Sequence, residues 1–260
     1  MEPVLVSLEA GVLCVTLNRQ DKLNAFNAEL HAALAAAMLR AETESAVRCV
    51  LITGAGRGFC AGADLTGRDL KADKNVDLGE TLDRNYNPLV RRMRALAKPI
   101  VCAVNGVAAG AGANFALACD IVLAARSASF IQAFVKIGLV PDCGGSYFLP
   151  RLAGTQRAMA LAMTGDRLSA EGAERFGLIW KAVDDDKLMA EAAKLSGHLA
   201  AGPTRSLGLI KKAMYSSANN DLAAQLDLER DLQREVGKGV DYREGVAAFL
   251  EKRKPAFTGK

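Results

Sequence analysis

One carboxylate lies in a glycine-containing segment with apolar residues on both sides. Asp142 lies in the run Pro141-Asp142-Cys143-Gly144-Gly145, between a rigid proline and two permissive glycines. Apolar residues flank this run, namely Phe134, Ile137, Leu139 and Phe148. Apolar surroundings raise the pKa of a carboxyl group, which suits general acid/base chemistry. The alternative is that Asp142 caps a following helix, as aspartate often does.

Two glycine-rich turns offer backbone N–H groups to a ligand. Their sequences are Ala61-Gly62-Ala63 and Ala109-Gly110-Ala111. Donors of this kind near helix starts, with small side chains around them, can converge on a developing oxyanion. The runs Gly54-x-Gly56 and Gly110-x-Gly112 reach Phe59 and Phe115 where a dinucleotide fingerprint needs a third glycine, and neither has the ending of a P-loop, so the sequence disfavours NAD and ATP. The alternative is that these glycines only permit tight turns and close helix packing.

The composition argues against several other classes of function. The chain has 260 residues, of which 50% are hydrophobic, and a formal net charge of +4. Its charges form no block of five or more of one sign, so nothing favours a nucleic-acid partner. Six cysteines without a C-x-x-C pair and two histidines, His31 and His198, disfavour zinc, a disulfide framework and a histidine-dependent nucleophile. Polar residues and glycines interrupt the apolar stretch 100–125, so we expect a cytoplasmic protein without a membrane partner.

The pattern of apolar residues predicts an α/β fold with a mostly parallel sheet. Apolar runs predict strands at residues 4–7, 12–17, 49–53, 100–104, 121–125 and 178–183. Helical spacing predicts helices at residues 27–44, 86–97 and 112–119, after Pro203, at 222–232 and at 243–251. Asn27 is the expected N-cap of the first helix, and residues 68–84 are expected to form a surface segment. Because strands nearly vanish beyond residue 150, we expect an α/β core over residues 1–200 and a helical region over residues 201–260.

Several short motifs, spread over nearly the whole chain, carry a resemblance to a known family. They are Asn18-Arg19, Lys22-Leu23-Asn24-Ala25, the run Gly58-Phe59-Cys60-Ala61-Gly62-Ala63-Asp64-Leu65, Lys98-Pro99, Asn105-Gly106 and Cys119-Asp120-Ile121. In order and spacing they resemble the enoyl-CoA hydratase/isomerase (crotonase) superfamily. This resemblance implies a crotonase-like (ClpP/crotonase) fold of repeated ββα units. It also implies a helical C-terminal region for oligomerisation, as a trimer or hexamer.

The resemblance implies roles for individual residues. The N–H groups of Ala63 and Ala111 fall where the family places its oxyanion hole, which holds the thioester carbonyl while an enolate forms. Many relatives carry glycine at the position of Ala111, but a methyl group leaves the backbone donor unchanged. The residues implied to bind coenzyme A are Lys22, Leu23, Ala25, Ala61, Ala63, Asp64 and Leu65, with Phe257 and Lys260 reaching the ligand of a neighbouring subunit. Coenzyme A is part of the acyl-CoA substrate, so we expect no separate cofactor and no metal.

A departure from the family pattern distinguishes hydration from isomerisation. Family hydratases use two glutamates to position and activate water, and the matching positions here are Asn114 and Phe134. Asn114 cannot exchange a proton usefully near neutral pH, and Phe134 excludes water. Asp142 matches the acid/base position of several family isomerases. One carboxylate suffices to remove a proton from one carbon and return it to another.

These observations predict an acyl-CoA isomerase in which Asp142 shuttles a proton. Four segments resemble the family members that act on the ring 1,2-epoxide of phenylacetyl-CoA, namely residues 86–92, 106–113, 141–145 and 257–260. The expected reaction converts this epoxide to the seven-membered oxepin thioester, and a Δ3/Δ2 double-bond shift in an enoyl-CoA would use the same groups. The alternatives are an enoyl-CoA hydratase of broad specificity and, from another class, a non-catalytic scaffold that binds acyl-CoA or RNA.

Overall fold

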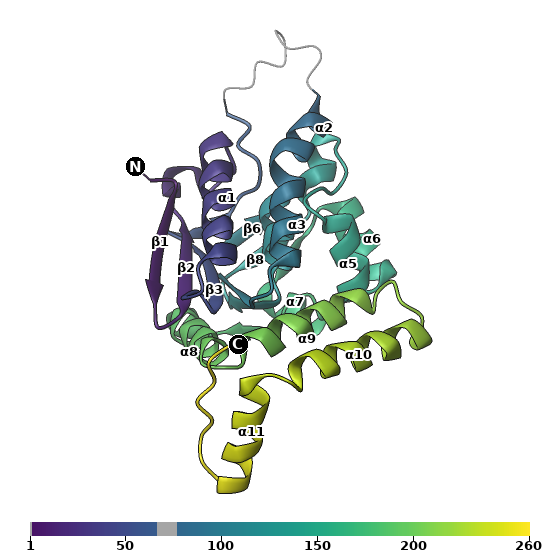
Figure 1. Cartoon of the computed structure of the whole chain (residues 1–260). Helices are drawn as coiled ribbons and strands as arrows, with labels where there is room; N and C mark the ends of the chain where they lie inside the picture. Colours follow the sequence, from purple (N-terminus) through teal and green to yellow (C-terminus); the bar gives the residue numbers. More distant parts are fainter. Residues whose placement is uncertain (1, 67–76) are drawn as a thin grey trace.

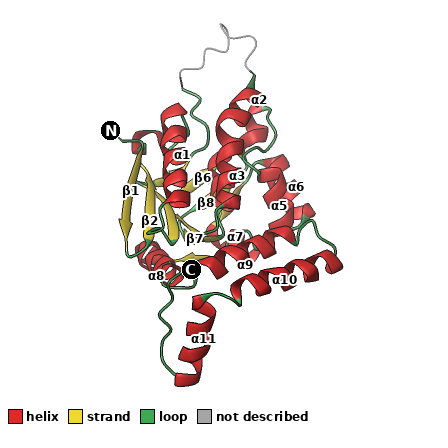
Figure 2. Cartoon of the chain, in the orientation of Figure 1, coloured by secondary structure: helices red, strands yellow, loops and turns green. Residues whose placement is uncertain are grey.

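Two β-sheets form the centre of the molecule, with helices around them (Figure 1, Figure 2). The structure, a computed structural model, describes residues 2–66 and 77–260. The larger sheet has the strand order β1 (Val4–Glu9), β2 (Val12–Leu17), β3 (Cys49–Gly54), β5 (Ile100–Val104), β7 (Ile121–Ala125) and β10 (Lys181–Val183). The smaller sheet has the order β4 (Gly58–Cys60), β6 (Val107–Ala109), β8 (Ser129–Ile131) and β9 (Arg167–Ser169).

The larger sheet begins with the predicted hairpin. β1 and β2 pair antiparallel, from Val4 opposite Leu17 to Glu9 opposite Val12. The turn residue Ala10 and its neighbour Gly11 both have positive φ angles, 47° and 80°, as a two-residue hairpin turn requires. The other strands of this sheet pair in parallel. β3 and β5 are buried along their whole length, which explains their continuous apolar sequences.

From β3 to β8, the strands of the two sheets alternate along the chain. β3 leads into β4, β5 into β6 and β7 into β8, and a helix follows each pair. β4, β6 and β8 pair in parallel, whereas β9 returns antiparallel to β8. This repetition confirms the predicted α/β fold of ββα units. Because β4 and β6 are parallel neighbours, the glycine-rich turns at their carboxyl ends leave the same edge of the sheet.

The helices pack around the sheets and extend beyond them. Their bounds are α1 (Ala28–Thr43), α2 (Leu78–Thr81), α3 (Asn87–Ala95), α4 (Ala111–Leu117), α5 (Gly145–Ala153), α6 (Thr155–Thr164), α7 (Ala170–Arg175), α8 (Leu188–Ala200), α9 (Thr204–Ser216), α10 (Leu222–Val236) and α11 (Val240–Glu251). Shorter helical turns cover Gln20–Lys22, Leu82–Tyr86, Ala133–Ile137 and Asp185–Lys187. α1 begins as predicted, because the Asn27 side chain accepts a hydrogen bond from Leu30 N. Across residues 2–66 and 77–260, no helix is long and apolar enough to cross a membrane.

Two predicted segments were wrong in part. The strand expected at 178–183 is only β10, because Gly177 adopts a positive φ of 78° and Leu178 N bonds to Ala173 O, which closes α7. The surface segment expected at 68–84 is helical from Leu78 onward, because the Asp77 side chain caps α2 by accepting from Glu80 N. Residues 67–76 of that segment lie outside the described residues.

The core contains five of the six cysteines and one of the two histidines. All six cysteines are free thiols, with Cys49, Cys60, Cys102, Cys119 and Cys143 buried and Cys14 half-buried. Burial raises the pKa of the Cys49 and Cys60 thiols to about 12. His31 is buried against the Phe26 ring, with 4.9 Å between ring centroids, whereas His198 is exposed on α8.

Of the C-terminal helices, α9 lies against the α/β body, whereas α10 and α11 lie farther from the sheets (Figure 1). α9 is tied to the core by a buried ion pair, in which Lys211 Nζ lies 2.9 Å from Asp120 Oδ2. α10 packs on α9, and α11 continues from it to the last residues of the chain. α8 ends at Ala200, where the helical region was predicted to begin. The division into two domains at that residue stays a prediction.

Candidate active site

The two glycine-rich turns touch each other. A Cβ atom added at Gly62 would lie 2.8 Å from Ala109 O and 3.6 Å from Ala111 N, and Gly62 itself has a φ of +93°. Only glycine fits that conformation and that close approach. The structure therefore brings the segments that carry Ala63 and Ala111 together, as the sequence predicted.

The Ala63 N–H is free to meet a ligand. Phe26 pairs with this segment on one side, because Phe26 N donates to Gly62 O (2.7 Å) and Asp64 N donates to Phe26 O (2.8 Å). In such a parallel pairing the N–H of the intervening residue, Ala63, faces the other way. Within the described ranges this N–H has no hydrogen-bond partner, and Ala63 is exposed.

The Ala111 N–H is the first donor of α4. Such a donor has no carbonyl partner within its own helix, and Gly110, the N-cap with a φ of 52°, provides no side chain to accept from it. A Cβ at Gly112 would lie only 2.3 Å from Cys60 O, so α4 starts directly against the end of β4. Ala63 and Ala111 thus offer two backbone donors from adjoining turns.

Asp142 lies between the helical turn Ala133–Ile137 and α5. Its main-chain carbonyl accepts from Gly145 N (2.8 Å) and from Asn114 Nδ2 (2.8 Å). Its Oδ1 atom is buried and has no hydrogen-bond partner in the part of the chain that the structure describes. Burial raises the pKa of the Asp142 carboxyl to about 6. The N-cap of α5 is Gly144, without a side-chain bond, so the alternative that Asp142 caps this helix is wrong.

Asn114 and Phe134 lie beside these groups. Asn114 is fully buried on α4, where its Oδ1 accepts from Gln132 Nε2 (2.9 Å) while its Nδ2 holds the Asp142 carbonyl. The Phe134 ring lies against Gly110, 3.7 Å from where a Cβ would be. Sequence reasoning missed Gln132, and its only signal was a lone amide between Ile131 and Ala133. The two positions where glutamates were expected in a hydratase thus hold an amide and a phenyl ring.

The residues expected to hold coenzyme A gather on two adjoining loops. Ala61 N donates to Leu23 O (2.9 Å), which places the segment Lys22–Ala25 beside the segment Ala61–Leu65. Lys22 and Leu65 are exposed, Leu23 and Ala61 are half-buried, and Ala25 is buried. Leu23 has a positive φ of 48°, a conformation that non-glycine residues seldom adopt.

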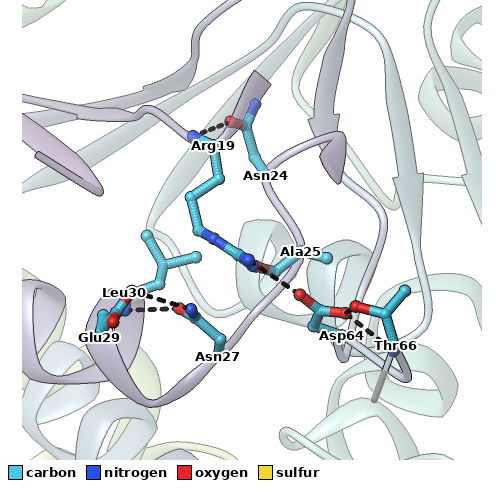
Figure 3. Close-up of polar contacts among 8 residues, drawn as sticks. All are labelled: Arg19, Asn24, Ala25, Asn27, Glu29, Leu30, Asp64 and Thr66. Carbon is cyan, nitrogen blue, oxygen red and sulfur yellow. Dashed lines mark hydrogen bonds and ion pairs between the residues drawn. The ribbon is translucent and has the colours of Figure 1, made fainter. Parts of the chain in front are cut away.

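Asp64 is held by groups of the protein itself (Figure 3). Its Oδ2 lies 2.9 Å from Arg19 Nη2, and its Oδ1 accepts from Thr66 N (3.0 Å) and from the Thr66 hydroxyl. The Thr66 bonds and then Arg19 lower the pKa of Asp64 to about 2. Arg19 belonged to a quoted motif, but the sequence suggested no role for its side chain.

Phe257 and Lys260 lie at the other end of the larger sheet. Arg48 immediately precedes β3, and its Nη1 donates to Phe257 O (3.2 Å). β3 runs away from that point for six residues, at about 3.3 Å per residue, before the chain enters β4, whose carboxyl end carries the turn with Ala63. The structure therefore does not bring Phe257 and Lys260 to the site of their own chain.

The site combines two backbone donors, which can stabilise an anion, with one carboxyl group, which can carry a proton. Two backbone donors can hold a carbonyl oxygen as it becomes an enolate oxygen. A carboxyl group with a pKa near 6 can take a proton from carbon and return it at neutral pH. In the ranges 2–66 and 77–260, no group of three His, Cys, Asp or Glu residues is placed to hold a metal ion.

The whole chain is similar to proteins of one family. The family model described as enoyl-CoA hydratase/isomerase matches residues 7–260. The 1,2-epoxyphenylacetyl-CoA isomerase of Escherichia coli (strain K12) is 57% identical over 261 residues, covering 100% of both chains. The 2,3-dehydroadipyl-CoA hydratase of the same organism is 35% identical over 260 residues, also covering 100% of both. The crystal structure of an enoyl-CoA hydratase from Polaromonas sp. JS666 matches with a TM-score of 0.91 and 35% identity, over 98% of this chain and 99% of that one.

Proposed function

The chain belongs to the enoyl-CoA hydratase/isomerase family and is an acyl-CoA isomerase, and from this premise we propose its substrate and mechanism. The proposed substrate is phenylacetyl-CoA with an epoxide at ring positions 1 and 2, and the product is the oxepin thioester. The relative that is 57% identical over the full length bears the name of this activity. The observation that carries the proposal is the Asp142 carboxyl, whose Oδ1 is buried without a partner and whose main-chain carbonyl is held by Asn114, while the two positions expected to hold glutamates in a hydratase are Asn114 and Phe134.

In the proposed mechanism one proton is transferred and one carbon–carbon bond breaks. The Ala63 and Ala111 N–H groups hold the thioester oxygen while Asp142 removes a proton from the carbon next to the thioester carbonyl, which gives an enolate. The bond between the two epoxide carbons then breaks, and its electron pair enters the double bonds of the ring, so the six-membered ring becomes a seven-membered ring. Protonated Asp142 returns the proton to a ring carbon, so the product is an isomer of the substrate. The same steps without the ring move a double bond from position 3 to position 2 of an enoyl-CoA.

We expect coenzyme A to lie along the loops that contain Lys22–Ala25 and Ala61–Leu65. The exposed Lys22 ammonium offers a positive charge to its phosphates, and the small side chains of Ala25 and Ala61 leave room for the adenine. Coenzyme A enters and leaves as part of the thioester. The proposal therefore includes no separate cofactor.

A double-bond shift in heavy water tests the proposal on a stable substrate. With a 3-enoyl-CoA we expect the 2-enoyl isomer and no mass increase from added water. Asp142→Asn should lower the rate by about 10²- to 10⁴-fold, because amides do not exchange protons usefully near neutral pH. Asp166→Asn, at an exposed aspartate, is the matched control and should keep wild-type turnover.

Two results would contradict this assignment. Addition of water that survives Asp142→Asn would favour the hydratase alternative, an activity that the 35% identical relative bears in its name. Tight binding of coenzyme A without turnover of any thioester would favour the non-catalytic scaffold.

We further propose that the chain assembles as a trimer or hexamer through α9, α10 and α11. Large apolar side chains are exposed along these helices, namely Ile210, Met214, Leu222, Leu226, Val240, Tyr242, Val246, Phe249 and Leu250. Six of them line a groove of about 740 Å³ between the three helices, namely Ile210, Leu226, Tyr242, Val246, Phe249 and Leu250. A contiguous apolar surface of this kind is typical of an interface between subunits. In such an assembly Phe257 and Lys260 would approach the coenzyme A of a neighbouring subunit.

A further inference from the structure

Arg19 and Asp64 join the two loops of the site, and no other part of the mechanism uses them. We propose that this ion pair is a positioning device for the oxyanion hole: it fixes the segment that carries the Ala63 N–H and neutralises the carboxylate next to it. The inference rests on the proposed function, because it takes the Ala63 N–H as a donor to the thioester oxygen.

The guanidinium of Arg19 spans both loops (Figure 3). Nη1 donates to the Ala25 carbonyl at 2.5 Å, and Nη2 donates to Asp64 Oδ2 at 2.9 Å. The Arg19 backbone is itself held, because its N–H donates to Asn24 Oδ1 at 2.8 Å. Asn24 in turn donates through Nδ2 to the carbonyls of Ala55 and Gly58. Arg19 is thus fixed at both ends, as a planar bidentate donor must be to hold its acceptors in place.

Asp64 transmits this constraint to its neighbour, Ala63. The Asp64 main chain donates to Phe26 O, and its side chain is bound by Arg19 on one oxygen and by Thr66 on the other. On the other side of Ala63, the Gly62 carbonyl accepts from Phe26 N, so the peptide that carries the Ala63 N–H is part of the bridge between Phe26 and Ala63. Arg19 binds the residue next to each side of this bridge, namely Ala25 and Asp64. Releasing these contacts would loosen the bridge and let the Ala63 N–H turn away from its target.

Charge gives the pair a second effect. The pKa of Asp64, held near 2, keeps this carboxylate ionised at neutral pH, one residue from the donor that would meet the enolate oxygen. A negative charge there opposes the formation of a second one, and the Arg19 guanidinium cancels it. The side chains are only 17% and 11% exposed for Arg19 and Asp64, so water screens this pair weakly. Loss of Arg19 should therefore lower kcat more than loss of Asp64.

This asymmetry makes the inference testable with three variants. Arg19→Gln should lower kcat by about 10²-fold and Asp64→Asn by about tenfold, with smaller changes in KM, because a displaced oxyanion donor acts mainly on the transition state. The double variant should be faster than Arg19→Gln alone, because removing the uncompensated carboxylate restores part of the rate. Arg126→Gln is the matched control, since Arg126 forms a 3.0 Å pair with Asp184 on the exposed surface.

A vibrational measurement separates positioning from folding. The probe is phenylacetyl-CoA with ¹³C in its thioester carbonyl, followed by infrared difference spectroscopy. Bound to the wild type, its carbonyl stretch should move to lower frequency, and Ala63→Pro, which lacks the donor, gives the benchmark for loss of that shift. Arg19→Gln should lose most of the shift and Arg126→Gln none. Should Arg19→Gln fail to fold, Arg19→Lys takes its place. This variant should give an intermediate rate and an intermediate shift, since lysine keeps the positive charge but lacks the planar bidentate guanidinium.

The outcomes distinguish this inference from the proposed function. A wild type that shifts no double bond contradicts the proposed function. An active wild type with unchanged kcat and unchanged carbonyl shift in both Arg19→Lys and Asp64→Asn overturns the positioning role. A double variant no faster than Arg19→Gln overturns the electrostatic part.

Discussion

Among single residues, the proposed proton carrier Asp142 should set the pH range of the reaction. The carboxylate must be ionised to remove a proton, and burial raises its pKa to about 6. We therefore expect kcat/KM to be level above this value and to fall about tenfold per pH unit below it. A profile measured from pH 4.5 to 8 with a 3-enoyl-CoA checks this. A profile that stays level down to pH 4.5 would show that another group acts as the base.

The residues of the site differ in how far the sequence reveals them. Ala63, Ala111 and Asp142 lie in short local motifs, and their expected chemistry depends on a backbone N–H or an apolar neighbourhood, so the sequence points to them directly; their catalytic roles stay predictions. Gln132 and Arg19 act through partners that only the fold supplies: Gln132 bonds to Asn114, 18 residues away, and Arg19 to Asp64, 45 residues away. Asp64 was expected to bind coenzyme A, and this stays a prediction. The bonds of its oxygens to Arg19 and Thr66 could not be predicted, because no local pattern indicates them.

At the scale of elements, the close approach of α4 to β4 determines where the Ala111 donor lies. Gly112→Ala would place a Cβ 2.3 Å from Cys60 O, and a backbone atom cannot yield cheaply. We expect this variant to lose about 1–3 kcal/mol of unfolding free energy and part of its activity. Urea unfolding followed by circular dichroism measures the first quantity, and turnover of a 3-enoyl-CoA the second.

Gly197 in α8 provides the matched control for this substitution. A Cβ there meets nothing within 4 Å, so Gly197→Ala should raise stability by about 0.5–1 kcal/mol through helix propensity alone. Equal changes in unfolding free energy for the two substitutions would show that the approach of α4 to β4 leaves room for a side chain.

The elements that the sequence predicts are those with long periodic patterns. The hairpin, α1 and the parallel strands β3, β5 and β7 are confirmed, because each has five or more residues with a clear apolar pattern. The smaller sheet could not be predicted, because β4, β6, β8 and β9 have three residues each. Their pairing depends on neighbours in space rather than on local spacing.

For the whole molecule, the exposed face of α11 predicts association. Phe249 and Leu250 are 82% and 74% exposed, which is costly in a lone chain. If this face packs between subunits, Phe249→Glu should reduce the molar mass measured by light scattering after gel filtration. The control Leu39→Glu alters an exposed leucine on α1 and should leave the mass unchanged. An unchanged mass for Phe249→Glu would place the interface elsewhere.

The burial of the cysteines makes it possible to measure how often the folded core opens. Five of the six free thiols are buried, and burial raises the pKa of Cys49 and Cys60 to about 12, so at neutral pH they are both out of reach and protonated. An alkylating reagent added to the folded protein can reach them only in the moments when the core is open. The rate at which alkylation adds mass at these cysteines therefore reports how often the core around the two sheets opens, without denaturant.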